Sequence, residues 1–274
     1  MIRIFIALVP FILSLNANLN AAEDQSTVLI TGSNRNIGFE FVKQFANKGW
    51  RVIATTRSID SADELIKFSK ENNNVIIEQL DITNDEHLRN LKKKYNDDVI
   101  DVLLNNAAYT PRYLSSFRGI DGVDHEATRK SFEVNTIGTM KVIQAFISNV
   151  EESNNGKIIN LSTKAASFEE RPEIPMMYSY AMSKAAMNSM VKTLSFETAE
   201  KNIIVIAISP GTVNTTLGMG LMGAIDIDES VSKMMVVIEN LTMDANGLFL
   251  DYEDGRVIGW GSAQIQYFKE SPFP

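Results

Sequence analysis

Short runs of β-branched and aliphatic residues recur along this chain from residue 27 onward. They lie at Thr27–Thr31, Arg51–Thr55, Val75–Gln79, Val99–Asn105, Lys157–Leu161 and Ile203–Ser209, with a weaker run at Gly247–Leu250. The longer segments between them carry apolar residues at helical spacing, as in Phe39, Val42, Phe45 and Ala46. Continuous apolar strands that alternate with amphipathic helices are typical of a parallel sheet with helices on both faces.

This alternation predicts an α/β fold with a doubly wound, Rossmann-like parallel sheet. No internal repeat, low-complexity tract or Pro/Gly-rich linker divides the chain after residue 23. We therefore expect one domain that spans residues 24–274.

Residues 1–23 follow a different pattern and are expected to lie outside this domain. Arg3 precedes an apolar run at residues 4–15, and the small residues Ala21 and Ala22 close the segment. A positive start, a short apolar core and small residues are typical of a secretory signal. The run is shorter than the roughly 20 residues of a membrane span, so we expect no stable span beyond this leader. We predict an exported protein; an uncleaved anchor, or a misassigned start in front of a cytoplasmic enzyme, is the alternative.

Composition excludes several classes of function. The 274 residues carry a formal net charge of −8, whereas general nucleic-acid binding needs clustered positive charge. The basic run Lys92-Lys93-Lys94 is interpreted as a solvated helix face. The chain has no cysteine and only two histidines, which are far apart in sequence. We therefore expect neither thiolate catalysis nor a metal centre.

In a sheet of this kind, ligands bind beyond the carboxyl ends of the strands. The first strand is followed by residues 31–38, which read Thr-Gly-Ser-Asn-Arg-Asn-Ile-Gly and lead into a helix. Glycines let the backbone approach a pyrophosphate closely, and the helix N-terminus offers free N–H groups to it. The sequence therefore favours nucleotide binding at this turn over a glycine turn without a ligand.

The end of the second strand bears on the choice of cofactor. An NAD site usually has an acidic residue here for the ribose 2′-hydroxyl, and an arginine suits a 2′-phosphate. Residues 54–58 contain no acid, whereas Arg57 lies here and Arg35 lies in the glycine loop. Either arginine alone could be a surface residue, but together they favour NADP over NAD.

The third and fourth strands end in polar residues. Asp81 could accept a hydrogen bond from the adenine amine, or it could cap a helix. Asn105 and Asn106 precede Ala107 and Ala108, whose small side chains permit close approach of a cofactor. The alternative is a buried turn in which the asparagine side chains bond to local backbone.

Tyr180 and Lys184 lie four residues apart and share one face if the segment is helical. A nearby ammonium group would lower the phenol pKa from its usual value of about 10. A tyrosine of this kind can exchange a proton with a carbonyl or an alcohol near neutral pH.

The ordered set of motifs resembles the short-chain dehydrogenase/reductase family. The set comprises the glycine loop, Asp81, Asn105-Asn106-Ala107, Asn135, Tyr180 with Lys184, and Pro210-Gly211. The resemblance extends from Thr27 to the C-terminus, and residues 229–250 resemble the C-factor and sniffer carbonyl-reductase subgroup.

The resemblance implies roles for the catalytic residues. Tyr180 would be the general acid/base, and Lys184 would lower its pKa and bind the nicotinamide ribose. Asn135 would hold a water of the proton relay. Thr163 falls where the family has its substrate-orienting serine, and Ser162 takes this place if the strand register slips by one residue.

The resemblance also implies a cofactor site that departs from the family pattern. Asn36 stands where the family usually has glycine, which asparagine can replace because it tolerates positive φ, and Ala108 replaces another usual glycine. The implied set is Gly32, Ser33, Asn34, Arg35, Asn36, Ile37, Gly38, Arg57, Asp81, Ile82, Asn106, Ala107, Ala108, Tyr180, Lys184, Pro210, Gly211, Val213 and Thr215.

The expected activity is NADP(H)-dependent reduction of an aldehyde or ketone to an alcohol. A weakly active or inactive nucleotide-binding signalling protein of the C-factor type is the alternative. Residues 164–177 are expected to form a loop over the substrate, and residues 217–227 a mobile lid. A homodimer or homotetramer is expected, because helices after Asn135 and Tyr180 would carry apolar faces.

Overall fold

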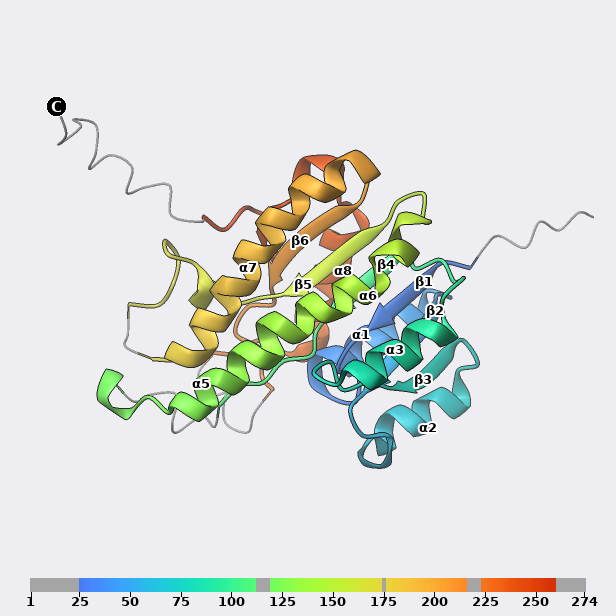
Figure 1. Ribbon diagram of the computed structural model, residues 1–274, viewed down its shortest axis with the longest axis horizontal. Coiled ribbons are helices and arrows are strands. Elements are labelled where there is room, and N and C mark those ends of the chain that lie inside the picture. The colour runs from blue at the N-terminus through green and yellow to red at the C-terminus, as the bar shows by residue number, and fades with distance from the viewer. Residues whose placement is uncertain (1–24, 112–118, 174–175, 216–222, 260–274) are drawn as a thin grey trace, which may run out of the picture.

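The computed structural model describes residues 25–111, 119–173, 176–215 and 223–259. Within these residues, seven strands form one sheet in the order β3-β2-β1-β4-β5-β6-β7, and every neighbouring pair is parallel (Figure 1). The strands are β1 (Thr27–Ile30), β2 (Arg51–Thr56), β3 (Val75–Gln79), β4 (Val102–Asn105), β5 (Lys157–Leu161), β6 (Ile204–Ser209) and β7 (Phe249–Asp251). The predicted single-domain, doubly wound α/β fold is confirmed.

Helices cover both faces of the sheet. The α-helices are α1 (Asn36–Asn47), α2 (Asp63–Glu71), α3 (Asp85–Lys94), α5 (His125–Phe132), α6 (Thr139–Glu151), α7 (Tyr178–Thr198) and α8 (Ile227–Glu239). A π-helical segment, η3 (Glu133–Gly138), joins α5 to α6. Short 3₁₀ turns are η1 (Ile59–Ser61), η2 (Ile120–Gly122), η4 (Lys164–Ala166), η5 (Ala199–Lys201) and η7 (Met243–Ala245).

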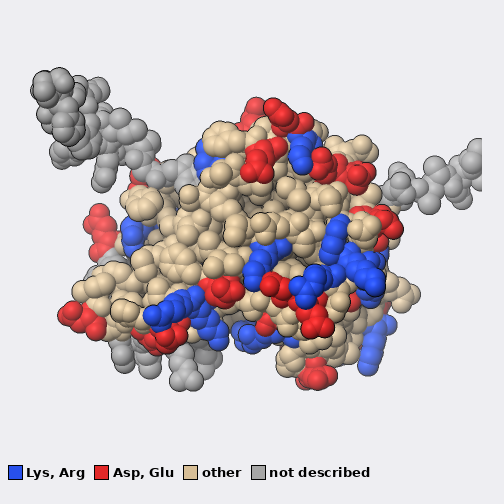
Figure 2. All heavy atoms as spheres, viewed as in Figure 1, with Lys and Arg blue, Asp and Glu red and all other residues tan. Residues whose placement is uncertain are grey.

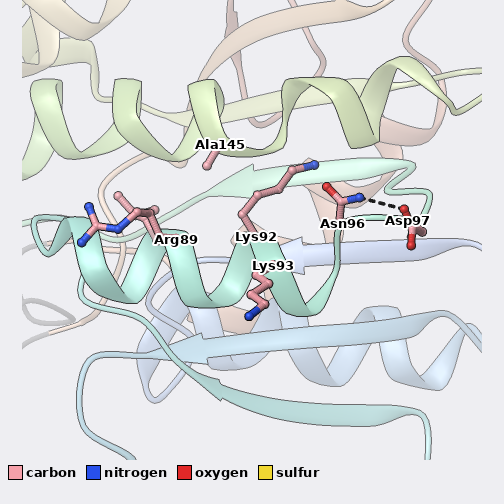
Figure 3. Close-up of a pocket in the computed structure, with 7 residues that line it drawn as sticks. Arg89, Lys92, Lys93, Asn96, Asp97 and Ala145 are labelled. Atoms are coloured by element: carbon pink, nitrogen blue, oxygen red, sulfur yellow. Dashed lines mark hydrogen bonds between the residues drawn. The ribbon is translucent and has the colours of Figure 1, made fainter.

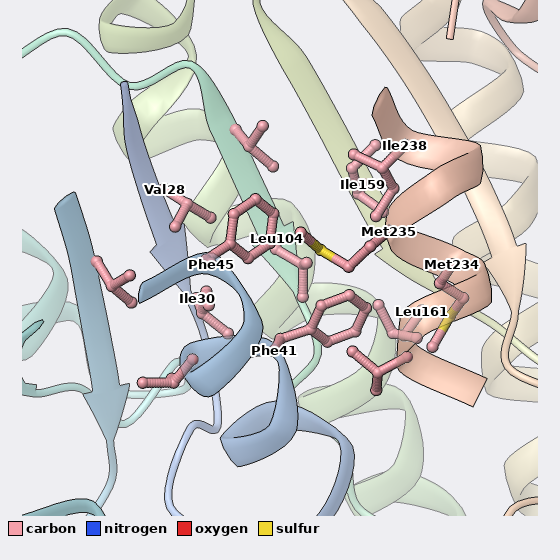
Figure 4. Close-up of a cluster of buried hydrophobic side chains, with 14 of the residues drawn as sticks. Val28, Ile30, Phe41, Phe45, Leu104, Ile159, Leu161, Met234, Met235 and Ile238 are labelled. Carbon is pink, nitrogen blue, oxygen red and sulfur yellow. The ribbon is translucent and has the colours of Figure 1, made fainter. Parts of the chain in front are cut away.

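Alternation along the strands divides the core into two layers. Successive side chains of a strand point to opposite faces, so Val28 and Ile30 of β1 face one layer and Leu29 faces the other. The first layer packs under α1 and α8, where Phe41, Phe45 and the two methionines of α8 meet the strands (Figure 4). The second layer packs under α3, α6 and α7.

β4 begins later than the apolar run predicts. The Val99 side chain is exposed, and the Ile100 N–H bonds to the Asn149 carbonyl of α6 instead of joining the sheet. The carboxylate of Asp101 accepts a hydrogen bond from the Thr27 N–H at 2.8 Å. Residues 99–101 therefore form a turn that ties α6 to the first strand.

Two expectations fall wholly or mainly outside the described residues. The predicted leader at residues 1–23 lies entirely outside the described residues. Of the predicted lid at residues 217–227, residues 217–222 lie outside them. Over the ranges that the structure does describe, no helix combines the length and the apolar character needed to cross a bilayer.

Phe41 provides a test of the core beneath α1. Its side chain is fully buried in the first layer, so Phe41→Ala should lower the free energy of unfolding by about 3–5 kcal/mol. The matched control is Phe196→Ala, because Phe196 is 70% exposed on α7; its effect should stay within about 0.5 kcal/mol. Urea unfolding followed by circular dichroism measures both, and equal effects would contradict this description of the core.

Candidate active site

The polar motifs gather along one edge of the sheet. Because all pairs of strands are parallel, the carboxyl ends of β1, β4, β5 and β6 lie at the same edge. The glycine loop after β1, the loop after β4, Thr163 after β5 and Pro210 after β6 all begin there. Ligands of such sheets bind at this edge, so the structure brings the predicted site together.

Two glycines of the loop are required by close backbone contacts. Gly32 has φ +69°, and a Cβ at this position would lie 2.9 Å from the Ala107 Cα. A Cβ at Gly38 would lie 2.2 Å from the Gly32 carbonyl oxygen. Asn36 has φ +50°, so asparagine does adopt the left-handed conformation at the place where the family has glycine.

The N-terminus of α1 is open to an anion. Arg35 precedes the helix in extended conformation, its side chain makes no capping hydrogen bond, and the first turn has no acidic residue. By contrast, Asn84 and Asp124 cap α3 and α5 with their side chains. The free N–H groups and the positive helix end of α1 therefore fit a phosphate group.

The Asn106 side chain bonds to local backbone, as the alternative for this turn predicts, and its contact with a cofactor stays a prediction. Its Nδ2 donates to the carbonyl oxygens of Thr31 and Gly32, at 3.0 and 2.9 Å. The Thr31 hydroxyl accepts from the N–H groups of Asn106 and Ala107, both at 3.0 Å. The asparagine side chain thus bonds to local backbone and holds the glycine loop against the end of β4, and of the three residues 106–108 only Ala108 is exposed.

Other residues of the implied cofactor set are also engaged in packing. Ser33 is fully buried and donates to the Ile30 carbonyl at 2.9 Å. Ile37 packs against the first core layer, and Ile82 is 5% exposed. Their side chains shape the backbone of the site, whereas the Arg35 side chain is exposed at its rim.

Asp81 lies at the carboxyl end of β3 as a charged acceptor. Its Oδ1 accepts from the Thr83 N–H at 3.0 Å and from the Thr83 hydroxyl at 2.7 Å. Burial acts to raise the Asp81 pKa, but the bonds from Thr83 and the electrostatic influence of Arg57 and His87 together outweigh it and lower the pKa. The ionised carboxylate is therefore the stable form, and Arg57 lies within its electrostatic reach.

Asn135 links the loop after β4 to α7. It is fully buried in the π-helical segment; its Oδ1 accepts from the Tyr109 N–H at 2.7 Å, and its Nδ2 donates to the Tyr109 carbonyl at 2.9 Å. The same Nδ2 donates to the Ser183 hydroxyl at 2.9 Å, and that hydroxyl donates to the Tyr180 carbonyl. The water-holding role of Asn135 stays a prediction; what the structure shows is a tie to the backbone of α7.

The two candidates for the substrate-orienting hydroxyl differ in their surroundings. Ser162 is 2% exposed, and its hydroxyl donates to Asn188 Oδ1 at 2.7 Å. Thr163 is half-buried just beyond β5, where its Oγ1 accepts from the Ala165 N–H at 3.3 Å. The Ser162 hydroxyl is committed to α7, so the structure favours Thr163. Asn188 was missed in the sequence because nothing in its neighbours along the chain shows that it faces β5.

Tyr180 and Lys184 lie on successive turns of α7. The Lys184 side chain is 1% exposed, and its Nζ donates to the Leu161 carbonyl at the end of β5, at 2.6 Å. The sulfur of Met187 lies 3.8 Å from the same nitrogen. Among the described residues, none of the carboxylates pairs with this amine, and Tyr180 as a whole residue is half-buried.

The expected effect of the lysine on the tyrosine pKa is wrong for this structure. Burial raises the pKa of Tyr180 to about 12 and lowers the pKa of Lys184 to about 7. The physical reason is that loss of water disfavours the charged form of each group, and the Lys184 amine is directed to the Leu161 carbonyl. The pKa of each group is therefore shifted by burial, and neither pKa is shifted by the charge of the other group.

The segment after β6 lies against the C-terminal part of the domain. Gly211 has φ +79°, and a Cβ there would lie 2.7 Å from the Tyr252 ring, so only glycine fits this turn. The Pro210 carbonyl accepts from the Ser230 hydroxyl of α8 at 2.7 Å. Both residues lie at the carboxyl edge, where the implied cofactor site is expected.

Val213 and Thr215 continue this segment. Val213 is 5% exposed and forms a parallel bridge with Ile225, while Thr215 is half-buried. Val213, which precedes the expected lid, thus lies beside Ile225 in the lid's described part, and residues 216–222 lie outside the described residues.

A separate groove of about 640 Å³ lies between α3 and α6 (Figure 3). It is lined by Leu88, Arg89, Lys92, Lys93, Asn96, Asp97 and Ala145. Lys92 spans it, with its Nζ bonded to the Ser148 hydroxyl and to Asn149 Oδ1. Basic side chains gather over this region with acidic ones among them (Figure 2), which agrees with a solvated helix face rather than a catalytic site.

Fold and site together define a dinucleotide-binding oxidoreductase. Their shared features are a parallel sheet, a glycine loop at an uncapped helix N-terminus, and a Tyr–Lys pair at the carboxyl edge. The chain belongs to the short-chain dehydrogenase family: the family model described as short chain dehydrogenase matches residues 26–223.

Individual relatives agree with this assignment. An uncharacterized oxidoreductase of Schizosaccharomyces pombe is 31% identical over 249 residues, which cover 84% of this chain and 96% of the relative. The NADPH-bound carbonyl reductase from chicken fatty liver superposes with a TM-score of 0.77 at 28% identity, covering 86% of this chain and 99% of that one. The carbonyl reductase Sniffer of D. melanogaster gives a TM-score of 0.77 at 27% identity, covering 86% and 100%. The resemblance inferred from the motifs is confirmed.

Burial of Lys184 predicts a pH-dependent stability. The folded protein releases the Lys184 proton near pH 7, whereas an unfolded lysine keeps it up to about pH 10. Between these values the unfolded chain binds more protons, so this residue makes the free energy of unfolding rise with pH. Relative to wild type, Lys184→Met should be most stable at or below about pH 7, and its advantage should shrink towards about pH 10.

Urea unfolding at a series of pH values measures this difference. Lys192→Met, the same exchange at an exposed position of α7, controls for the loss of a lysine. If the difference in the free energy of unfolding between wild type and Lys184→Met does not vary with pH, Lys184 is not a buried amine that titrates near pH 7.

Proposed function

We propose that this protein is an NADP(H)-dependent oxidoreductase that reduces an aldehyde or ketone to an alcohol, with Tyr180 as the proton donor. The observation that carries the proposal is the buried Lys184 amine, one helical turn from Tyr180 and bonded to the end of β5. Burial of an amine without an acidic partner destabilises a fold, and such perturbed groups cluster at functional sites. The similarity to carbonyl reductases in solved structures supports the same activity.

The residues at the edge of the sheet fit a dinucleotide. Gly32 and Gly38 leave no room for a Cβ, and the uncapped N-terminus of α1 suits a pyrophosphate. The exposed guanidinium groups of Arg35 and Arg57 would bind a 2′-phosphate, and Asp81 would bind the adenine amine. When bound, NADPH supplies the hydride.

The chain's own groups supply the proton and orient the carbonyl. With a pKa raised to about 12, the Tyr180 phenol stays protonated around neutral pH and can donate to a carbonyl oxygen. The protonated phenol is the form that reduction of a carbonyl uses, whereas oxidation of an alcohol would use the phenolate. The Thr163 hydroxyl at the end of β5 would donate a second hydrogen bond to the same oxygen. Lys184, with a pKa lowered to about 7, can hold or release a proton near neutral pH and so return one to Tyr180.

Substitution of Tyr180 tests the mechanism. Tyr180→Phe should lower kcat for NADPH-dependent reduction of small aldehydes and ketones by about 10²–10⁴-fold, since it removes the general acid. NADPH binding, followed by nucleotide fluorescence, should change little. Turnover equal to wild type would eliminate Tyr180 as proton donor. NADPH binding by wild type without turnover of any carbonyl in the panel would favour the alternative, a nucleotide-binding signalling protein.

Substitution of the two arginines tests the cofactor preference. Arg35→Gln/Arg57→Gln removes both charges that suit the 2′-phosphate, so the ratio of NADPH to NADH affinity should fall about tenfold or more. Arg89→Gln/Lys93→Gln, in the groove between α3 and α6, also removes two positive charges and provides a control of equal charge change. An unchanged ratio in the double variant would show that these arginines do not select the cofactor.

Two further expectations remain predictions. Export directed by residues 1–23 is one of them. Assembly into a homodimer or homotetramer is the other, and Met140 of α6 and Met182 of α7, 39% and 44% exposed, provide apolar surface for it.

A further inference from the structure

A cluster of charged residues connects the segment after Thr163 to the end of the last strand. Asp251 ends β7 and is only 2% exposed. The Lys164 Nζ lies 2.6 Å from its Oδ2, and the Arg256 guanidinium lies 3.5 Å from the same oxygen. A buried carboxylate requires partners of this kind, so Asp251 holds Lys164, the residue directly after Thr163.

Arg256 makes a second, stronger contact with the same loop. Its two terminal nitrogens donate to the two carboxylate oxygens of Glu170, at 2.8 and 2.7 Å. This bidentate geometry is the strong form of an ion pair, and the hydrogen bonds from Arg256 hold the pKa of Glu170 below its ordinary value. The pair joins residues 86 positions apart in the chain.

Ser167 completes the attachment of the loop. Its hydroxyl accepts from the N–H groups of Glu169 and Glu170, at 3.1 and 3.0 Å. The same hydroxyl donates to the Gly259 carbonyl at 2.8 Å. The loop is therefore bound to residues 251–259 at its beginning, its middle and its end.

The same strand end also contacts the opposite wall of the site. Tyr252 follows Asp251, its N–H bonds to the Ser209 carbonyl of β6, and its ring packs against Gly211. Residues 251 and 252 thus touch both the segment that begins with Thr163 and the turn that follows β6. A shift of this strand end would move both walls.

We propose that Arg256 and Asp251 are positioning residues that, through Glu170 and Lys164, fix residues 163–170 as a wall of the substrate pocket. The proposal deepens the proposed function and rests on it for the pocket, whereas the attachment of the loop stands on the contacts alone. The ion pairs set the position of the Thr163 hydroxyl without touching the substrate themselves. Loosening them should weaken substrate binding and leave unchanged the part of the cofactor site that follows β1, β2 and β3, with the glycine loop, Arg57 and Asp81.

The experiment uses the Arg256–Glu170 pair, because its side chains are 46% and 28% exposed and can be replaced without burying a new group. Arg256→Gln and Glu170→Gln each remove the ion pair, and Arg256→Lys keeps the positive charge. Lys201→Gln breaks an exposed ion pair with Glu151 elsewhere and serves as the matched control.

Two independent readouts are taken on the full-length protein. Amide hydrogen exchange of residues 164–170 should accelerate about threefold to fivefold in Arg256→Gln and Glu170→Gln. The KM for a carbonyl substrate should rise by a similar factor, with kcat and the NADPH affinity within about twofold of wild type. Arg256→Lys should recover part of both effects. In the Arg256→Gln background, Glu170→Gln should add little, because both changes remove the same interaction.

The outcomes separate this inference from the proposed function. Exchange of residues 164–170 that stays at the wild-type rate in both single variants would overturn the inference, whatever the activity. Faster exchange with an unchanged KM would overturn the pocket role. If wild type reduces no carbonyl, the proposed function fails, and hydrogen exchange still decides whether the ion pairs hold the loop.

Discussion

The bond between the Lys184 amine and the Leu161 carbonyl is the contact on which the site depends. It attaches α7, which carries Tyr180, to the carboxyl end of β5, which leads into Thr163. One turn further along α7, Asn188 Oδ1 accepts a hydrogen bond from the Ser162 hydroxyl, which is a second bond between α7 and the end of β5. These two bonds fix the relative positions of the phenol and the threonine hydroxyl. They also explain why a lysine can be fully buried here although burial lowers its pKa to about 7.

A second set of buried polar contacts builds the nucleotide side. Asn106 and Thr31 hold the glycine loop against the end of β4 with side chain to backbone bonds. The helix α1 that follows the loop has no side-chain cap at its N-terminus, so its first N–H groups are available to a phosphate. From their positions in the sequence, Asn106 and Ser33 would be assigned to cofactor contact. In the structure their side chains bond to backbone and shape the loop that would bind the cofactor.

The fold and the order of the motifs could be predicted well from the sequence. All the predicted strands are present with boundaries shifted by at most a few residues, because a strand covered on both faces must be a continuous apolar run. The positive φ of Asn36 was also predictable, since asparagine is one of few residues that tolerate it. The direction of the Tyr180 pKa shift could not be predicted in this way. Helical spacing places Tyr180 and Lys184 on one face but says nothing about how much water reaches them.

What the sequence by itself determined is local: which segments form strands and helices, where glycine is required, and which side chains follow each strand. The tertiary structure alone decided which of these side chains are free to act. It committed Ser162 to Asn188 and left Thr163 at the edge, and it joined Arg256 to Glu170 across the loop. The physical reason is that periodicity encodes burial along one element, whereas hydrogen bonds and charges between distant elements depend on how those elements pack.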